Sequence, residues 1–386
     1  MRPADPLLTS DQAAMSESLD ALCSKLISDD YLRCLDEEVR YPYEVMDALA
    51  AGGWAELCVP EADGGQGASA QDLCVLLETV ASHSLAVAQS IYSLWIMGAE
   101  ALARLGTDAQ RARWLPGIVA GTGRIALAIT EPGSGSDAAG MRMTAVPDGD
   151  GFLVTGQKVF ITGAAICDVI VTAVRTSAEQ QRQKGISLLL IEPGTAGVTV
   201  RKIPKMGLKA LDLCEVFFDG VSVPDSALLG GRGAGWAGLQ PGLAKERLLL
   251  AAIATGALQD VLARCTEYAG VRTAFGRPIA THQLITDKLV RMRVALETAR
   301  ALVRRAAELT DLGHPSAAAA ASMAKLTATT DYISACREGV QVFGGYGFTD
   351  EYQISRHYRD CKYLEIGGGT SEVQKIVIAR SMGIRA

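Results

Sequence analysis

The sequence predicts an α+β multidomain fold, with an N-terminal α-helical domain at residues 1–123, a middle β-domain at 124–232 and a C-terminal α-helical bundle at 233–386. Three observations support this prediction. Apolar residues recur at helical spacing before about residue 118, short strand-like runs fill the middle, and long helical runs return after about residue 236. A chain of 386 residues also exceeds what a single hydrophobic core usually organises.

The N-terminal part predicts helices separated by a glycine-rich loop. The run SDQAAMSESLDALCSKLI begins with a Ser-Asp capping signal and has apolar residues at helical spacing. The segment PEADGGQGAS, at Pro60–Ser69, predicts a loop because its glycines interrupt regular structure. The following run, QDLCVLLETVASHSLAVAQSIYSLWIMGAEALARLG, predicts two mostly buried helices.

The middle part predicts short strands joined by turns. Four runs are rich in β-branched and aromatic residues and are bounded by Gly, Pro or Asp: GFLVTGQKVFITG, ISLLLIEPG, GVTVRKI and CEVFFDGVSV. GDG at Gly149–Gly151 is typical of a hairpin turn. Because no helix alternates with these strands, we expect an antiparallel sheet rather than a βαβ arrangement.

The C-terminal part predicts three long helices. They are LAKERLLLAAIATGALQDVLARCTEYAGV, ITDKLVRMRVALETARALVRRAAELTDLG and SAAAAASMAKLTATTDYISACREGVQVFGG. Gly313 and Pro315 end the second of these helices. The alanine run at Ala317–Ala321 favours helix and not disorder.

Composition excludes several functions. The net charge of −6 argues against nucleic acid or an anionic membrane as a partner, because both favour basic patches. The nine cysteines show no CxxC spacing and no nearby histidine cluster, so we expect reduced thiols and no metal site. No run approaches the ~18 apolar residues of a membrane span, and the N-terminus resembles no targeting signal. We therefore expect a cytoplasmic protein.

The loop ALAITEPGSGSD, at residues 126–137, is a candidate ligand site where the helical and β parts meet. Gly133 and Gly135 allow close backbone approach, and loop N–H groups can form an anion-binding nest. Three hydroxyls accompany them, on Thr130, Ser134 and Ser136. Taken alone, such a loop is more typical of a capped surface turn, and it is not a GxGxxG motif.

Five motifs in order change this interpretation. TEPGSGSD is followed by VFIT, VRTAFGRPIATHQ, QVFGGYGF and GGGTSEVQ, and together they resemble the acyl-CoA dehydrogenase family of flavoenzymes. The resemblance extends from PEADGGQG to the last helix. It implies an N-terminal helical domain, a middle β-domain and a C-terminal four-helix bundle. It also implies FAD as the cofactor, bound across a subunit interface of a homotetramer.

The resemblance assigns flavin contacts to matching residues. The stretch along the flavin contains Leu127, Ile129, Thr130, Gly135 and Ser136, with Ser136 also near the acyl-CoA. Phe160, Ile161 and Thr162 match the segment against the isoalloxazine ring, where the family often has Trp in place of Phe160.

Other matching residues are expected at the ends of the cofactor. Residues expected to reach the FAD of a neighbouring subunit are Arg272, Phe275 and Gln283, completed on the adenine side by Gln341, Gly344 and Gly345. A guanidinium such as that of Arg272 suits a diphosphate because it offers a charged, forked donor. Thr370 and Glu372 match the stretch at the first flavin's diphosphate, at the start of the final helix, where a helix N-terminus favours anions.

The catalytic base is displaced relative to many family members. The position that often carries the base, in a Glu-Gly-Thr motif, is Gly368 here. Isovaleryl-CoA and long-chain dehydrogenases carry their base instead in a Glu-Arg-Leu segment, and AKERLLLAA places Glu246 there. We therefore predict Glu246 as the base. Glu365 is the rival carboxylate, because it lies close to the glycine loop in sequence.

The implied reaction is α,β-dehydrogenation of an acyl thioester. The base removes the α-proton, and the β-hydrogen passes as hydride to flavin N5. In the family, the FAD ribityl 2′-hydroxyl and the backbone N–H at the Gly368 position polarise the thioester oxygen. Electrons then pass to an electron-transfer flavoprotein.

The substrate is predicted only by class. Its expected contacts are Ser136, Tyr92, Trp95, Leu243, Arg247, Gly368 and Gly369. Tyr92 and Trp95 lie on the helix that walls the acyl pocket in the family, and they favour short or branched acyl groups. Simple core packing explains these aromatics equally well. A coenzyme A ester and an acyl group on a carrier protein both fit.

Three other functions stay open. The N-terminal stretch and LEIGGGTSE also resemble the crotonobetainyl-CoA reductase branch, which forms the saturated thioester. A flavin-dependent monooxygenase on the same fold would react quickly with oxygen after reduction. A flavin-free interaction protein would be colourless when purified.

Overall fold

The computed structural model describes residues 7–384, and its N-terminal third is helical, as expected. The helices are α1 (Ser10–Leu26), α2 (Asp29–Glu38), α3 (Tyr43–Ala51), α4 (Ala70–Ala81), α5 (Leu85–Ser90), α6 (Met97–Leu105) and α7 (Asp108–Val119). Side-chain caps fix several of their starts. Thr9 caps α1 in a capping box with Gln12, so the cap lies one residue before the Ser-Asp signal.

One continuous helical stretch contains a wider turn. Residues Ile91–Ile96, labelled η3, form a π-helix between α5 and α6. Such wide turns inside α-helices are uncommon and occur often at functional sites. This segment carries Tyr92 and Trp95, so their directions differ from those in a regular α-helix.

The middle part forms one eight-stranded sheet. Its strands are β1 (Ile125–Ala128), β2 (Thr144–Asp148), β3 (Gly151–Thr162), β4 (Val169–Arg175), β5 (Ile186–Ile191), β6 (Val198–Lys202), β7 (Leu213–Pro224) and β8 (Leu228–Leu229). Their order is β6-β7-β3-β2-β4-β5-β8, with β1 on β4. The predicted hairpin turn is confirmed, because Asp148 pairs with Gly151 across a two-residue turn.

The expectation of a purely antiparallel sheet is wrong. Most pairs are antiparallel, but β1 pairs in parallel with β4 from Ile125↔Val169 to Ala128↔Thr172, so the sheet is mixed. The β2–β3 hairpin lies between these two strands in the sequence, and it gives the chain enough length to return in the same direction. Neither strand stood out among the four predicted runs.

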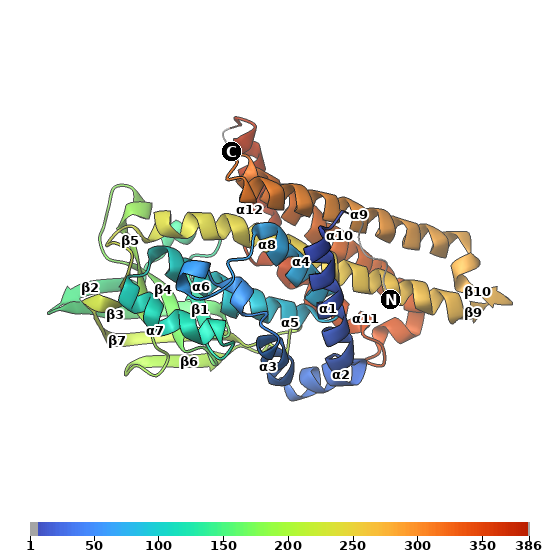
Figure 1. Ribbon diagram of the computed structural model, residues 1–386, viewed down its shortest axis with the longest axis horizontal. Helices are drawn as coiled ribbons and strands as arrows, with labels where there is room; N and C mark the ends of the chain where they lie inside the picture. Colours follow the sequence, from blue (N-terminus) through green and yellow to red (C-terminus); the bar gives the residue numbers. More distant parts are fainter. Residues whose placement is uncertain (1–6, 385–386) are drawn as a thin grey trace.

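The C-terminal part is a helical bundle. It contains α8 (Gly235–Val271), α9 (Gln283–Asp311), α10 (Ala317–Phe343), α11 (Ile354–Ile366) and α12 (Ser371–Ser381), with a small hairpin of β9 (Thr273–Ala274) and β10 (Arg277–Pro278). Figure 1 shows the sheet at one end of the molecule and this hairpin at the opposite end, joined along the long axis by α8. The glycine loop lies between α11 and α12.

Most of the helical core is continuous. Buried residues of the N-terminal helices, of one sheet face and of the bundle belong to one cluster, and the other sheet face has a smaller core. By length and composition, Leu85–Leu105 and Gly235–Val271 could cross a membrane, but 94% and 78% of these apolar windows are buried inside the fold. The cysteines are free thiols.

Candidate active site

Glu246 and Gly368 are neighbours in space. Glu246 lies on α8 and is half-buried, and Gly368 lies in the loop after α11. A Cβ atom on Gly368 would stand 3.2 Å from Cγ and 3.3 Å from Cδ of Glu246, and it would clash with Leu250. Leu250 therefore occupies the start of that side-chain space, and the Glu246 carboxyl lies directly beside it.

The surroundings of Glu246 change the pKa of its carboxyl group. Burial raises the pKa of the Glu246 carboxyl, because the charged form loses hydration. A hydrogen bond with Tyr92 and the charges of Lys325 and Arg247 partly offset this rise in pKa. A carboxyl with a raised pKa suits a general base, because its ionised form binds a proton more readily.

Buried side chains hold the carbonyl groups of the glycine loop. The Lys325 ammonium, on α10, donates to the carbonyls of Gly367 and Gly369, both at 2.6 Å. The Gln374 amide donates to Gly369 at 2.6 Å and to Gly368 at 3.3 Å. Both side chains are almost fully buried, so this side of the loop is anchored to the protein interior.

The N–H groups of the same loop are free. Among residues 7–384, no acceptor takes a hydrogen bond from the N–H of Gly368 or Gly369. Both glycines are half-buried and have positive φ, at 64° and 85°, which glycine adopts at little cost. The loop can therefore donate to a ligand beside Glu246.

A chain of hydrogen bonds through Gln89 and Tyr363 lies next to the Glu246 carboxyl. The Gln89 amide, on α5, donates to Ser93 at 2.8 Å and to the Tyr363 hydroxyl at 2.9 Å. Tyr363 also hydrogen-bonds Thr162, and the charge of Glu246 contributes to its raised pKa, after burial. This chain of hydrogen bonds therefore links the N-terminal helices, the sheet and α11 around the carboxyl.

The predicted substrate residues divide into two groups. Leu243, Glu246 and Arg247 share one half-buried face of α8 at helical spacing, and Tyr92 reaches the carboxyl from η3. Trp95 is 1% exposed and belongs to the helical core, and its indole nitrogen has no partner in the described chain. Glu365, the rival carboxylate, forms an ion pair with Lys362.

The predicted flavin face is built around a bulge in β3. The register of β3 against β7 shifts between Lys158 and Ile161, and Phe160 within this bulge has φ 61° and is 59% exposed. The Val159 N–H donates to the Thr130 carbonyl at 2.9 Å, which ties the bulge to the 126–137 loop. A large aromatic residue at positive φ is a genuine outlier and motivates a functional hypothesis.

A buried ion pair clamps the same loop. Lys158, fully buried, donates to Glu131 and to the Ile129 carbonyl, each at 2.9 Å. Glu131 also accepts from the N–H groups of Arg142 and Met143. Each charge is therefore satisfied, as buried charges need to be. The clamp fixes the loop against the sheet.

The remaining flavin-stretch residues differ in exposure. Leu127, Ile129, Thr130 and Thr162 are half-buried, and Gly135 and Ser136 are exposed. A Cβ atom at Gly135 would meet nothing within 4 Å, so space is open there. Ile161 is an exception, because its side chain is 2% exposed and packs in the sheet core. Its side chain is therefore not exposed to a ligand.

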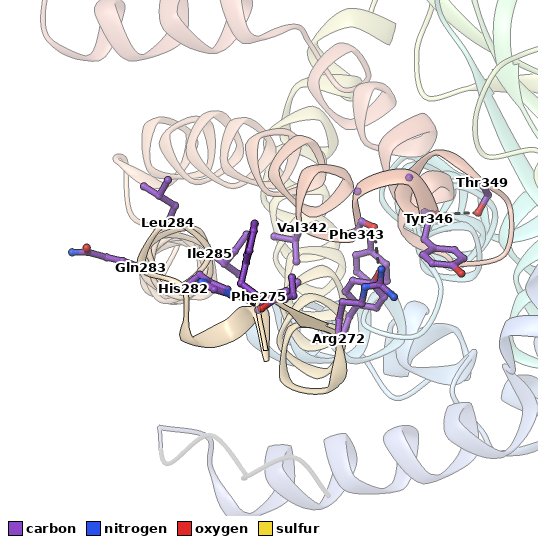
Figure 2. Close-up of a pocket in the computed structure, with 15 residues that line it drawn as sticks. Arg272, Phe275, His282, Gln283, Leu284, Ile285, Val342, Phe343, Tyr346 and Thr349 are labelled. Atoms are coloured by element: carbon purple, nitrogen blue, oxygen red, sulfur yellow. Dashed lines mark hydrogen bonds between the residues drawn. The ribbon is translucent and has the colours of Figure 1, made fainter. Parts of the chain in front are cut away.

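A separate cavity lies at the far end of the bundle (Figure 2). It has a volume of about 910 Å³. Of the residues predicted to reach a neighbouring subunit's cofactor, the structure brings five together in its lining: Arg272, Phe275, Gln283, Gly344 and Gly345. Gln341 is not in the lining. The size is within the usual range for cofactor sites.

The hairpin gives this cavity a prominent aromatic residue. Phe275 and Gly276 form the turn between β9 and β10 with φ of 54° and 78°, and Phe275 is 95% exposed. Turns with positive φ at both central residues normally use Asn, Asp or Gly. Arg272, just before the hairpin, has no acidic partner in the described part of the chain.

The final helix begins where the sequence predicts. Thr370 caps α12 and its hydroxyl accepts from the Val373 N–H, so this hydroxyl already has a partner within the protein. Glu372 lies in the first turn, and hydrogen bonds with its own backbone N–H and with Thr370 lower its pKa.

Sequence reasoning missed several residues around the carboxyl. Lys325, Gln374, Gln89 and Tyr363 were not singled out. Lys325 is a lone lysine in the apolar run ASMAKLTATT, which is the one local signal that it is buried. For the other three residues we find no sequence signal, because their roles depend on contacts between distant segments.

Comparison with known proteins identifies the family. Residues 9–122, 126–221 and 233–383 match the family models for the N-terminal, middle and C-terminal domains of acyl-CoA dehydrogenases. The chain belongs to the acyl-CoA dehydrogenase family and is an oxidoreductase of that family.

Individual relatives differ in the reactions that their names describe. Benzylmalonyl-CoA dehydrogenase of Aromatoleum aromaticum is 36% identical over 97% of this chain and 98% of its own length. The caffeyl-CoA reductase-Etf complex subunit CarC of Acetobacterium woodii is 34% identical, covering 92% of this chain and 93% of its own.

Solved structures agree with this assignment. Butyryl-CoA dehydrogenase of Megasphaera elsdenii superposes with a TM-score of 0.92 at 31% identity, covering 98% of this chain and 99% of the other. The FAD complex of PigA superposes with a TM-score of 0.93 at 30% identity, covering 99% and 100%.

Proposed function

We propose that this protein is an FAD-dependent dehydrogenase that introduces an α,β double bond into an acyl thioester, with Glu246 as the base. The observation that carries this proposal is the position of the Glu246 carboxyl against the side-chain space of Gly368. A base at either position could reach the same substrate carbon.

The residues present fit FAD. The bulge presents Phe160 outward beside the Thr130 loop, and the hairpin presents Phe275 and an unpaired Arg272 over the second cavity. Phe160 and Thr162 would lie against the ring system, and Arg272 would hold a diphosphate from a second subunit. When bound, the flavin supplies the acceptor for the β-hydrogen and its electron pair.

The chain's own residues perform the remaining chemistry. Glu246 takes the α-proton, and the free N–H of Gly368 donates to the thioester oxygen, on which negative charge develops as the Cα–H bond breaks. The Cβ–H bond then breaks with its electron pair leaving, and the Cα=Cβ double bond forms. Tyr92 and Tyr363 flank the carboxyl and limit the access of water.

The acyl group is short or branched in this proposal. The hydrogen-bonded pair of Gln89 and Tyr363 and the buried Tyr92 occupy space beside the base, which supports a short pocket. The carrier is coenzyme A, in agreement with the names of the relatives. An acyl-carrier-protein substrate remains the alternative, and a matched pair of CoA and carrier-protein thioesters would separate the two.

The electron partner in this proposal is an electron-transfer flavoprotein, and the assembly is a homotetramer. The similarity to a subunit of a reductase-Etf complex supports the electron-transfer flavoprotein as the partner. The exposed aromatic and cationic residues around the second cavity support the homotetramer, because another subunit would cover them and complete the cofactor site.

The reverse reaction is a second candidate function. Similarity to a caffeyl-CoA reductase subunit and to 3-(aryl)acrylate reductase of Clostridium sporogenes favours reduction of an enoyl thioester. The same base would then deliver the proton to Cα. Dithionite-reduced enzyme that is reoxidised rapidly by enoyl-CoA, with no bleaching by saturated acyl-CoA, would select this direction.

The main test is anaerobic titration with short, branched and long acyl-CoAs while the flavin absorbance is followed. Wild type should bleach with short or branched thioesters, whereas Glu246→Gln should retain the flavin and lose at least about 10³-fold in turnover. Because the pKa of Glu246 is raised, wild-type kcat/KM should fall as the pH drops through that raised value, where the carboxylate is protonated. Near-wild-type turnover of Glu246→Gln would contradict the base assignment.

A further inference from the structure

Lys325 is a buried charged group that the proposed reaction does not use. It is 1% exposed, in the middle of α10, and its ammonium contacts the two carbonyls that flank Gly368. Burial lowers the pKa of Lys325 to about 8, although the negative charges of Glu246 and Glu365 act in the opposite direction and raise it. Keeping a lysine in such a place is costly unless its hydrogen bonds have a purpose.

Peptide geometry connects these contacts to the free N–H groups. Every described peptide bond is trans, so the C=O of Gly367 and the N–H of Gly368 point in opposite directions from one plane. When Lys325 draws the Gly367 carbonyl toward the interior, the Gly368 N–H must face away from it. The same relation lets Gln374, bound to the Gly368 carbonyl, turn the Gly369 N–H outward.

The loop needs such an external support. Three consecutive glycines have the greatest conformational freedom of any tripeptide, so the chain by itself does not fix where these N–H groups point. A donor that polarises a developing oxyanion acts efficiently only if it is already oriented.

We propose that Lys325 is a positioning residue for the dehydrogenation: it holds the Gly367–Gly369 loop so that the Gly368 N–H faces the thioester oxygen, and its charge keeps Glu246 ionised. This inference rests on the proposed function. Its role is indirect, because its ammonium is bound to the loop carbonyls and it acts through the loop and the base.

The electrostatic part involves groups on three elements besides α10. Around Lys325 and Glu246 lie Tyr92 on η3, Arg247 on α8, and Tyr363 and Glu365 on α11. Arg247 also favours the Glu246 carboxylate, whereas Tyr92 contributes a hydrogen bond. Removing the charge of Lys325 therefore weakens one of two cationic influences and raises the pKa of Glu246 further.

Three substitutions separate the two roles. Lys325→Met removes both charge and donors, Lys325→Gln keeps a donor without charge, and Lys325→Arg keeps both. Lys325→Met should lower kcat about 100-fold, as expected for a lost oxyanion donor. It should also shift the acid limb of the kcat/KM profile, the pH range in which kcat/KM falls as Glu246 is protonated, upward by about one pH unit. Lys325→Gln should show the pH shift with a smaller loss of kcat, and Lys325→Arg should restore the acid limb.

A matched control lies one turn away on the same helix. Thr329 is buried and its hydroxyl donates to the Lys325 backbone carbonyl at 2.8 Å. Thr329→Val perturbs the packing of α10 without changing charge or touching the glycine loop. It should lower the melting temperature but leave the acid limb of kcat/KM in place.

A spectroscopic readout tests the orientation of the N–H directly. The probe is 2-butenoyl-CoA labelled with ¹³C at the thioester carbonyl, bound to the oxidised holoenzyme and measured by isotope-edited infrared spectroscopy. The carbonyl stretch should move to lower frequency on binding to wild type and Thr329→Val. In Lys325→Met it should return part of the way to the frequency of the free thioester, because one of the two donors to the thioester oxygen is misoriented.

The outcomes separate this inference from the proposed function. If wild type bleaches with acyl-CoA but Lys325→Met keeps its kcat, acid limb and carbonyl frequency, Lys325 is structural only and the inference is overturned. If wild type itself fails to bleach with any thioester, the proposed function is overturned instead. Should Lys325→Met not fold, the acid limb of Lys325→Gln against Lys325→Arg decides the question.

Discussion

The Glu246 carboxyl borders the space that a side chain at position 368 would enter, so carboxylates at both positions would crowd each other. A side chain at position 368 would begin 3.2 Å from Cγ of Glu246 and would clash with Leu250. Its backbone would also have to keep a φ of 64°, which side chains other than glycine adopt with strain. The glycine at position 368 and the carboxylate at position 246 are therefore structurally linked.

Transfer of the base to the glycine position should recover part of the activity. Glu246→Gly combined with Gly368→Glu removes the contact with Glu246 but leaves the clash with Leu250. We expect measurable but low turnover, and a several-fold increase when Leu250→Ala is added. Stopped-flow flavin reduction under anaerobic conditions measures both variants.

The control for this experiment is the single substitution at the glycine position. Gly368→Glu in the presence of Glu246 should be the least stable variant, because it has both the strain and the crowding. If the triple variant binds flavin and substrate but remains completely inactive, the two positions are not interchangeable.

At the scale of single elements, the bulge in β3 decides which side chain faces the proposed flavin site. Alternation along a strand would place neighbouring residues on opposite faces, and one extra residue changes that alternation. Phe160 is consequently exposed, while Ile161 packs in the sheet core. The hydrogen bond from Val159 to Thr130 keeps this bulge beside the 126–137 loop.

A glycine in the bulge should separate stability from cofactor binding. Phe160→Gly relieves the strain of φ 61° and removes little buried surface, so apoprotein stability should change by less than about 1 kcal/mol. The FAD dissociation constant should rise at least tenfold, because an aromatic contact is lost. Chemical denaturation of apoprotein and FAD titration by fluorescence measure the two quantities.

Phe152 provides the matched control within the same strand. It is 4% exposed in the sheet core, and Phe152→Ala should destabilise the apoprotein by about 3 kcal/mol or more. FAD affinity of the folded fraction should stay unchanged. Unaltered FAD affinity in Phe160→Gly would remove Phe160 from the flavin site.

At the scale of the whole molecule, the two candidate sites lie far apart along its long axis. Glu246 and Arg272 are separated by roughly 39 Å along α8 at the 1.5 Å rise per residue of a helix, and Figure 1 shows the hairpin of the second cavity at the end of the molecule opposite the sheet. A single cofactor therefore connects these two sets of residues only if they come from different subunits. This arrangement supports the proposed homotetramer, in which flavin retention would depend on assembly.

Loss of the hairpin contacts should release flavin without unfolding the subunit. Arg272 and Phe275 are exposed, so Arg272→Met with Phe275→Ala should leave far-ultraviolet circular dichroism unchanged. The flavin-to-protein absorbance ratio should fall several-fold, because a charged diphosphate contact is lost. Sedimentation velocity with absorbance at both wavelengths follows flavin and assembly together.

Arg337→Met is the control for a nearby charge on the bundle, because Arg337 is exposed and pairs with Glu338 outside the cavity. It should retain its flavin. An Arg272 and Phe275 double variant that keeps a full complement of FAD would show that the cavity is not a flavin site.

The sequence by itself determined the α, β, α order and the family resemblance, because these depend on periodicity and on motifs that are contiguous in the chain. The pairing of Gly368 with Glu246 was then implied by the resemblance. Helix starts such as that of α12 at Thr370 were also predictable, because capping is local.

Only the tertiary structure decided the parallel pairing of β1 with β4, the outward direction of Phe160 and the contacts of Lys325 with the glycine loop. Lys325 and Gly367 are separated by 42 residues, and a lysine in a helical run is normally solvent-exposed. Its burial follows from the packing of α10 against the loop before α12. The physical reason is that such contacts are set by how whole elements pack, and local sequence does not encode that packing.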